Sequence, residues 1–283
     1  MPAGKKVWLF PKPAIIAAMK ALPRTSCLDG KGQPIPAAIF PRGLRQPPGS
    51  FRFSLDALLL AAAVPPGRHA ALLDCGTGCG AAALGALLRS PGLRGVGLDL
   101  QPELIQAALL NAERLGLGQR FAAETVDFRN EPDPALKALL QASFDCCIMN
   151  PPYRILGRGR LPSSELRARA LFGEPGLVGS FLRWAGMGLH NEGILYLIFP
   201  AGDEGRLALE ENGFFPFRKT LVSSRPGMPP HLLLLESAKK KPSARPEQKK
   251  LFLFAGKEKH APYSDEAVAF CPWLEQAQAA NTA

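Results

Sequence analysis

The sequence contains no long uninterrupted hydrophobic run. No window reaches the ~18 apolar residues that a membrane-spanning helix needs. The longest candidate, residues 55–66, is interrupted by Asp56 and ends in two prolines. Near the N-terminus Lys5 and Lys6 precede a short apolar run, as in a secretory signal, but prolines soon break it. These absences argue against a membrane protein and against a secreted one.

Cysteine is scarce and irregularly spaced. The six cysteines show no disulfide framework, and Cys146 and Cys147 are adjacent, so in a strand they would point to opposite faces. A reduced, cytoplasmic chain is the simplest interpretation. Cys75 and Cys79 are spaced as metal ligands can be, but no second Cys or His pair with ligand spacing follows them, so we expect no metal.

The composition is that of a globular chain. The 283 residues are 47% hydrophobic and 20% charged, which excludes a wholly disordered chain and allows one large domain or two small ones. Glycine and proline number 28 each and follow no Gly-x-y period, which excludes collagen. We expect many tight loops instead.

Acidic residues are outnumbered, and the excess of positive charge is uneven. The net charge is +10. Residues 1–50 hold eight Lys or Arg against one acid, whereas residues 51–150 hold eight against ten. Basic flanks beside a nearly neutral core suit a polyanionic partner such as nucleic acid. Charge that serves only solubility would give the same count, so this observation leaves both interpretations open.

From residue 71 onward, short apolar runs alternate with amphipathic segments. The apolar runs predict buried strands at 71–75, 95–100, 121–127, 144–149 and 193–199. The other segments predict helices at 57–64, 79–89, 102–115, 134–141, 164–189 and 203–212. This alternation indicates an α/β fold whose parallel sheet has helices on both faces. Residues 214–223 and 231–237 are two further strands, and their short connection makes them antiparallel.

Composition divides the chain into three parts. Residues 1–45 are predicted to form a basic, Pro-rich arm, residues 46–238 the α/β domain, and residues 239–283 a basic tail. Within the tail, residues 239–250 hold six basic residues and one acid, which is typical of a charged linker. Residues 251–254 are a candidate for one short added strand.

A Gly-rich loop joins the first predicted strand to the first helix after it. Its sequence is Asp74-Cys-Gly76-Thr-Gly78-Cys-Gly80. Small residues let the chain turn sharply and let a ligand approach the backbone closely. Such a loop is weak evidence by itself, because many α/β proteins use one only as a tight turn.

Acids at the next two strand ends strengthen the case for a cofactor. Asp99 ends the second strand, where a carboxylate can bind both hydroxyls of a ribose, and Leu100 beside it is a further candidate contact. Asp127 ends the third strand and could meet an adenine ring, next to the backbone of Phe128. The set predicts an adenosine-containing cofactor without separating a dinucleotide from S-adenosylmethionine.

The fourth predicted strand, 144–149, runs into Asn150-Pro151-Pro152-Tyr153. Two prolines fix the backbone and remove two donors, which leaves carbonyl oxygens and the Asn150 amide oxygen as acceptors, while Tyr153 offers a flat face. This set suits a planar group bearing an amine. Two acceptors on its hydrogens would pull the nitrogen toward tetrahedral geometry and aim its lone pair at a methyl donor. The alternative is a Pro-rich loop that merely ends a strand.

These motifs resemble class I S-adenosylmethionine-dependent methyltransferases of the Asn-Pro-Pro-Tyr group, which act on exocyclic amines of bases or on glutamine in release factors. Residues 46–61, which begin Gln-Pro-Pro-Gly, and residues 97–104, which begin Gly-Leu-Asp-Leu, resemble the bacterial tRNA(Val) adenine-N6 methyltransferase family. The resemblance covers about residues 46–237. It implies a Rossmann-like sheet of seven strands with a C-terminal antiparallel hairpin, S-adenosylmethionine as cofactor, and Asn150 at both the cofactor and the acceptor.

Several acceptors fit the same motifs. The first choice is adenine N6 in tRNA; the alternatives are release-factor glutamine, rRNA guanine N2, DNA adenine, and an RNA-binding module without catalysis. Eleven prolines before position 67 argue against the helical substrate domain that release-factor enzymes carry before the Gly-rich loop. We therefore expect an RNA partner, and we assume that the protein is a monomer.

Five arginines follow Tyr153 in the sequence. They either bind phosphates around the target base or belong to the solvated start of a helix: Arg154, Arg158, Arg160, Arg167 and Arg169.

Overall fold

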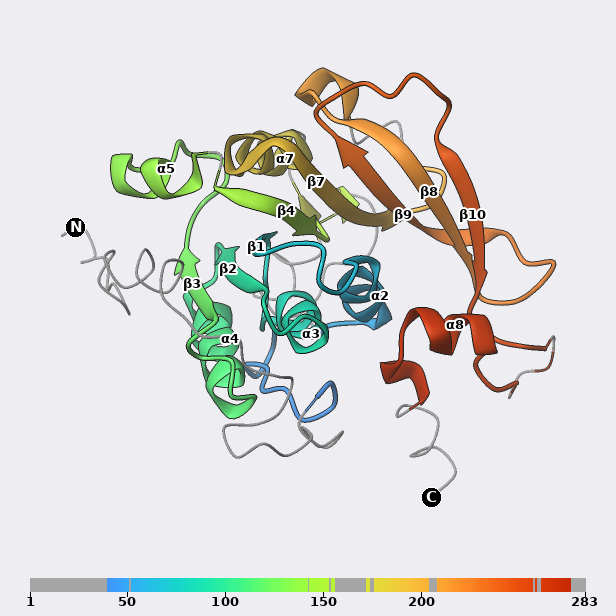
Figure 1. The fold of residues 1–283 in the computed structure, drawn as a ribbon. Helices are drawn as coiled ribbons and strands as arrows, with labels where there is room; N and C mark the ends of the chain where they lie inside the picture. The colour runs from blue at the N-terminus through green and yellow to red at the C-terminus, as the bar shows by residue number, and fades with distance from the viewer. Residues whose placement is uncertain are drawn as a thin grey trace.

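The computed structural model shows a twisted sheet between two layers of helices (Figure 1). It describes residues 40–50, 52–141, 143–152, 154–155, 172–173, 176–203, 208–256, 258 and 261–275. Most of the expected N-terminal arm, Tyr153, and the four expected arginines from Arg158 to Arg169 lie outside the described residues.

Eight strands form the main sheet: β1 (Ala71–Cys75), β2 (Arg94–Asp99), β3 (Phe121–Thr125), β4 (Phe144–Met149), β7 (Leu189–Pro200), β8 (Phe215–Ser223), β9 (Pro230–Ala238) and β10 (Glu247–Phe252). Their order is β10-β8-β9-β7-β4-β1-β2-β3, and β9 runs antiparallel to its neighbours. The Rossmann-like sheet with an antiparallel hairpin is confirmed. The expected count of seven strands is wrong. Residues 247–252, most of which were predicted to belong to a charged linker, form an eighth strand that pairs with β8.

Helices cover both faces, as expected. One face carries α2 (Leu55–Ala63), α3 (Ala81–Arg89), α4 (Pro102–Arg114) and α8 (Asp265–Phe270). The other carries α5 (Pro134–Leu140) and α7 (Leu177–Gly188) (Figure 1). The helix predicted over 203–212 is, in its described part, only a single 3-10 turn, η2 (Glu210–Asn212). A separate short pair is formed by β5 (Arg154–Ile155) and β6 (Phe172–Gly173).

The alternation of strand side chains separates two hydrophobic cores. Cys146 lies in the core beneath α2, α3 and α4, whereas Cys147 lies in the core beneath α7, as their adjacency in a strand predicts. In β2 the alternate positions facing the first core are glycines. A Cβ on Gly97 would come within 2.7 Å of the Thr77 hydroxyl, so only glycine lets the loop after β1 pack this closely.

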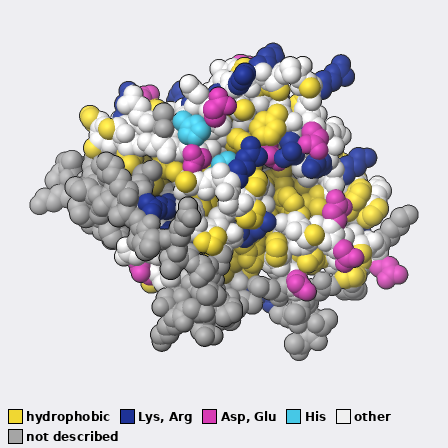
Figure 2. Space-filling model, in the orientation of Figure 1, with side chains coloured by type: hydrophobic (Ala, Val, Ile, Leu, Met, Phe, Trp, Pro, Cys, Tyr) yellow, Lys and Arg dark blue, Asp and Glu magenta, His cyan; other side chains and the backbone are white. Residues whose placement is uncertain are grey.

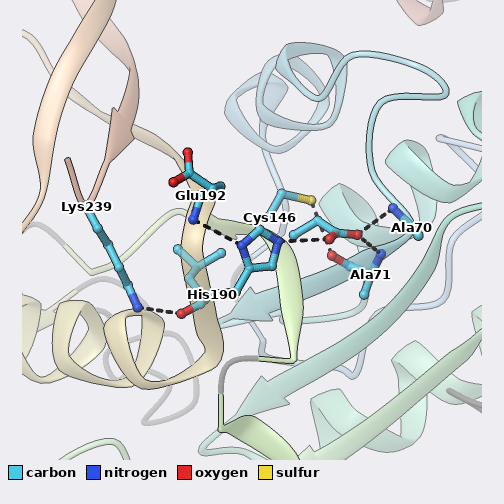
Figure 3. A network of polar contacts seen from close by, with 8 residues as sticks. Ala70, Ala71, Cys146, His190, Glu192 and Lys239 are labelled. Atoms are coloured by element: carbon cyan, nitrogen blue, oxygen red, sulfur yellow. Dashed lines mark hydrogen bonds and ion pairs between the residues drawn. The ribbon is translucent and has the colours of Figure 1, made fainter. Parts of the chain in front are cut away.

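A polar network fixes the register of β1 and β4 at the edge where these strands begin (Figure 3). The Asp145 carboxylate accepts the amides of Ala70 and Ala71 at 2.7 and 2.9 Å, and it contacts His190 Nε2 at 3.0 Å. The Glu192 amide donates to His190 Nδ1, so the Nε2 atom carries the hydrogen that points at Asp145. Burial alone would raise the pKa of Asp145, but the two amides and His190 lower it.

The segment after residue 238 is part of this fold. Arg218 of β8 makes a two-bond contact with Glu236 of β9 at 2.9 Å, and its Nε donates to Glu247 of β10 at 2.7 Å, so one guanidinium links three strands. Beyond β10 the chain reaches the helices α2 and α3. There Trp273 is buried, with its ring 5.2 Å from that of Phe40.

The lysines of this segment lie at the edge where β9 ends and β10 begins. In Figure 1 this edge is at the top of the picture. Figure 2, in the same orientation, shows Lys and Arg side chains in dark blue at the top of the molecule. Lys239 donates to the carbonyls of Gly186 and Leu189 and so caps the C-terminal end of α7 (Figure 3). Within the described part of the chain, no helix is long and apolar enough to cross a membrane.

We expect Trp273→Ala to lower the free energy of unfolding by about 3–4 kcal/mol, because it removes a buried aromatic ring and leaves a cavity against α3. Urea unfolding followed by circular dichroism measures this loss. Trp273→Phe is the matched control, since it keeps a ring against Phe40 and should lose less than about half as much. An unchanged midpoint in the alanine variant would show that the C-terminal segment does not dock on the domain.

Candidate functional site

The candidate site is built at the edge where the parallel strands end. Cys75, the last residue of β1, is in register with the penultimate residue of β2 and with the last residue of β4. The next residues are therefore Gly76, Asp99 and Asn150, which lie side by side. Adjacent strands are ~5 Å apart, so Asp99 and Asn150 flank Gly76 at about that spacing. The structure thus brings together the loop, the ribose candidate and the amine candidate.

The loop after β1 is held by backbone hydrogen bonds and needs glycine at three positions. Gly76, Gly78 and Gly80 have φ angles of +82°, +56° and +86°. The amides of Gly76 and Thr77 both donate to the Leu98 carbonyl, at 2.8 and 2.9 Å. A Cβ on Gly78 would meet nothing within 4 Å, so the loop has an open side at this residue. Open space at such a loop is what a cofactor needs to approach the backbone.

Asp74 is a buried carboxylate directly before the loop. It accepts the Thr77 hydroxyl at 2.8 Å, and only 2% of the residue is exposed. Burial raises its pKa to about 7, a change that the Thr77 hydrogen bond opposes and the nearby Asp99 reinforces. Thr77 is a supporting residue that the sequence interpretation missed, and its only signal was its place between two glycines.

Asp99 ends β2 with both carboxylate oxygens engaged and further acceptor capacity left. Its Oδ2 accepts the Gly78 amide at 2.9 Å and its Oδ1 accepts the Gln101 amide at 3.0 Å. Each oxygen has a second lone pair, which suits a pair of ribose hydroxyls. Burial raises the pKa of Asp99, and the two backbone amides oppose that rise. Leu100 follows with 37% of its surface exposed, an apolar side chain open beside the acid.

Asp127 and Phe128 lie beyond the end of β3. The Asp127 carboxylate pairs with Arg129 at 2.6 Å, and this contact lowers its pKa. A contact of Asp127 with adenine would therefore compete with Arg129, and it stays a prediction. The Phe128 ring is buried and stacks on the Phe181 ring, with centroids 4.1 Å apart. The ring is therefore part of the core, and only the backbone of Phe128 is a candidate contact for a ligand.

An aromatic cluster from α7 supports the loop from the second core. A Cβ on Gly76 would come within 3.0 Å of the Phe181 ring, so that ring lies directly against the turn. Trp184 packs edge-on against Phe128 and donates its indole hydrogen to the Asn130 carbonyl at 3.2 Å. The sequence analysis did not identify Phe181, because its position in α7 shows only an ordinary apolar helix face.

Asn150 and the prolines follow β4. Asn150 is partly exposed, Pro151 is buried and Pro152 is partly exposed. Asn150 therefore lies at an accessible strand end, and the residue after it is buried. The flat face expected of Tyr153 lies outside the described residues.

Within the described residues, neither a metal cluster nor a large cavity at the other edge of the sheet adds to this site. Among the described residues, no group of three or more His, Cys, Asp or Glu is arranged to hold a metal ion. A cavity of about 1010 Å³ lies at the opposite edge, lined by residues that include Arg68, Asp145 and His190. Asp145 and His190 bond to each other and to the backbone there, which is a structural role.

No family model matches the chain. The tRNA1(Val) (adenine(37)-N6)-methyltransferase of Bacteroides fragilis (strain YCH46) is 27% identical over 190 residues, which cover 66% of this chain and 76% of that protein. The release factor glutamine methyltransferase of Rhodospirillum rubrum is 34% identical over 106 residues, but these cover only 38% of this chain and 28% of that protein.

The crystal structure of a predicted O-methyltransferase from Agrobacterium tumefaciens has the same fold. It matches with a TM-score of 0.61 and 21% identity over 77% of this chain and 96% of that one. The expected resemblance to tRNA(Val) adenine-N6 methyltransferases is confirmed by sequence and the fold by structure. The expected enzyme class, an S-adenosylmethionine-dependent methyltransferase, agrees with the names of both relatives, which are methyltransferases.

We expect Gly78→Ala to weaken S-adenosylmethionine binding by at least about tenfold, since it puts a methyl group on the open side of the loop. Titration calorimetry measures the affinity. Gly67→Ala is the matched control: Gly67 has φ +73°, also has nothing within 4 Å of a Cβ, and lies at the opposite edge. Both variants should lose roughly 1–2 kcal/mol of stability from backbone strain. Equal cofactor affinity in the two variants would contradict the assignment of the loop.

We expect Asp74 to make the ligand-free protein less stable as pH rises. Its folded pKa of about 7 lies above the ordinary value near 4, so between these values the folded state keeps a proton that the unfolded state releases. Stability is therefore lost across pH 4–7, by on the order of 4 kcal/mol at most. Asp74→Asn removes this loss, so its advantage over the wild type should grow up to pH 7 and then level off. A constant difference from pH 4 to 8 would show that Asp74 is ionised in the folded protein.

Proposed function

We propose that this S-adenosylmethionine-dependent methyltransferase transfers its methyl group to the N6 amine of an adenosine in tRNA, in the cytoplasm. The observation that carries the proposal is the extent of the similarity. The match to the tRNA methyltransferase of Bacteroides fragilis covers 76% of that protein, whereas the match to the release-factor enzyme covers 28%. The first match therefore extends over most of that relative, whereas the second extends over less than a third of the release-factor enzyme.

The cofactor side is assigned to the loop and the strand ends beside it. Asp99 would hold the ribose through the free lone pairs of its carboxylate, and Leu100 would lie against the adenine. The open side of the loop at Gly78 would receive the rest of the molecule. Asp74 would act through Thr77, by fixing the shape of the loop. Bound there, S-adenosylmethionine supplies an electrophilic methyl group.

The acceptor side is assigned to Asn150 and the residues after it. The Asn150 amide oxygen would accept one hydrogen of the N6 amine and the Pro151 carbonyl the other. Two acceptors draw the nitrogen out of conjugation, so that its lone pair can form the new N–C bond as the S–C bond breaks. The extra proton then leaves to water, and no strong base is needed. Tyr153 and Pro152 would bound the plane of the base.

The release-factor alternative uses the same four residues, so the substrate has to be tested directly. Mass spectrometry of tRNA nucleosides from cells with and without the gene would detect the product. We expect N6-methyladenosine to disappear from one tRNA in the deletion strain. Unchanged tRNA together with a missing methyl group on a release-factor glutamine would replace the proposal by its rival.

We expect Asn150→Ala to lower the rate of methyl transfer by about 10² to 10³, because one of the two acceptors on the amine is lost. Cofactor affinity measured by calorimetry should stay within about twofold, because Asp99 and the loop are untouched. Asp99→Ala is the complementary control. It should weaken cofactor binding by roughly 30- to 150-fold, the worth of ~2–3 kcal/mol of charge-assisted hydrogen bonds. Wild-type turnover in Asn150→Ala would remove Asn150 from the reaction.

A further inference from the structure

The turn between β8 and β9, residues 224–229, stands beyond the edge that carries the candidate site. In register, Asn150 is level with Ile198 of β7 and with Leu234 of β9. Pro230, where β9 begins, lies four residues further out, which is ~13 Å at the rise of a strand. Because β9 is two strands from β4, the turn is also ~10 Å to one side of Asn150. It therefore forms a rim above the acceptor side.

This rim carries an exposed hydrophobic side chain that packing does not explain. Met228 is 54% exposed, more than Leu110 at 45% or Leu100 at 37%, the other large hydrophobic residues exposed in the described part of the chain. It sits in the sequence Arg225-Pro-Gly-Met-Pro-Pro, whose prolines restrict the backbone. One exposed methionine is ordinary by itself. The position of Met228 on the rim, on a backbone that prolines restrict, is what makes it a candidate contact for a partner.

The C-terminal segment braces the turn from behind. The Phe254 amide donates to the Ser224 carbonyl at 3.0 Å, and the Arg225 guanidinium lies over the Phe254 ring at 5.0 Å. Phe254 in turn stacks on Tyr263, with ring centroids 4.9 Å apart and 14° between the planes. The segment leading from β10 to α8 thus holds the base of the turn, beside the strands to which it connects (Figure 1). These contacts fix the base of the turn to the C-terminal segment.

We propose that Met228 is a wedge that packs against the nucleotide next to the methylated adenosine in the tRNA; this inference rests on the proposed function. For Asn150 to reach the N6 amine while Pro152 and Tyr153 bound the plane of the adenine, the base has to leave the stack. Proteins that open stacks insert apolar side chains, methionine and proline among them, between neighbouring bases. Met228 with its flanking prolines has that chemistry, and Arg225 adds positive charge near the phosphates.

The lysine-rich stretch at 239–250 is less well placed for this contact. It connects β9 to β10 at the edge opposite the candidate site, and Lys239 is used to cap α7. Lys249 pairs with Glu247 at 3.4 Å, and Lys241 lies 3.6 Å from Glu210. Lysines so placed add general attraction for RNA at most, whereas the turn at 224–229 lies on the same edge of the sheet as Asn150.

The test compares two substitutions of the same kind. Met228→Glu and Leu110→Glu each replace an exposed apolar side chain by a carboxylate, one on the rim and one on α4. We expect Met228→Glu to raise the KM for tRNA between about 5- and 150-fold, the worth of one stacked base, and Leu110→Glu to leave it unchanged. Cofactor affinity and thermal midpoint should match the wild type in both. Equal KM values in the two variants would overturn the wedge.

Two neutral variants separate packing from charge. Met228→Leu keeps an apolar side chain of similar size and should retain a KM near that of the wild type, whereas Met228→Ser should lose several-fold. If Met228→Ser binds and methylates tRNA like the wild type, the contact is not a wedge. Failure of the proposed function is distinct, because then the wild-type enzyme itself would form no N6-methyladenosine in tRNA.

Discussion

The register of β1 against its two neighbours is the constraint on which the candidate site depends. It places Gly76 between Asp99 and Asn150, three residues that are far apart in the chain. The register is fixed at the opposite end, where the Asp145 carboxylate of β4 binds the two amides that lead into β1. A slip of one residue would exchange the faces of every side chain in β1 and move its carboxyl end away from Asp99.

Close packing around the loop extends this constraint into three dimensions. From the first core, the absence of a side chain on Gly97 lets Thr77 sit against β2 and donate to Asp74. From the second core, the ring of Phe181 contacts the turn at Gly76. The loop is therefore held from both faces of the sheet while its side at Gly78 stays open. Because the loop already has its bound shape, little of the binding free energy is lost in ordering it when the ligand binds.

The sequence predicted the fold well because the order of helices and strands depends on local patterns, and the same patterns indicated which residues follow the strand ends. Short apolar runs indicated β1 to β4, and Asp or Asn at the predicted strand ends indicated Asp99 and Asn150 as candidates. Of the eighth strand the sequence indicated only the end, at residues 251–254. Residues 247–250 are polar, and the pairing of β10 with β8 and the Arg218 contacts stabilise them in the sheet. Thr77 and Phe181 were missed because their roles arise from contacts between distant segments, which no short pattern records.

The two edges of the sheet carry different kinds of polar group, and this difference bears on how a nucleic acid would be bound. At the edge where β1 and β4 begin, Asp145 and His190 bond to each other and to the backbone, so they hold the fold. At the edge where the strands end, Asp99 keeps acceptor capacity and Leu100 and Met228 keep exposed apolar surface. Recognition of a base needs both hydrogen-bond acceptors and apolar faces, whereas attraction of a phosphate chain needs only positive charge. The strand-end edge therefore has the chemistry of selective contact, and the lysine-rich end has at most that of general attraction.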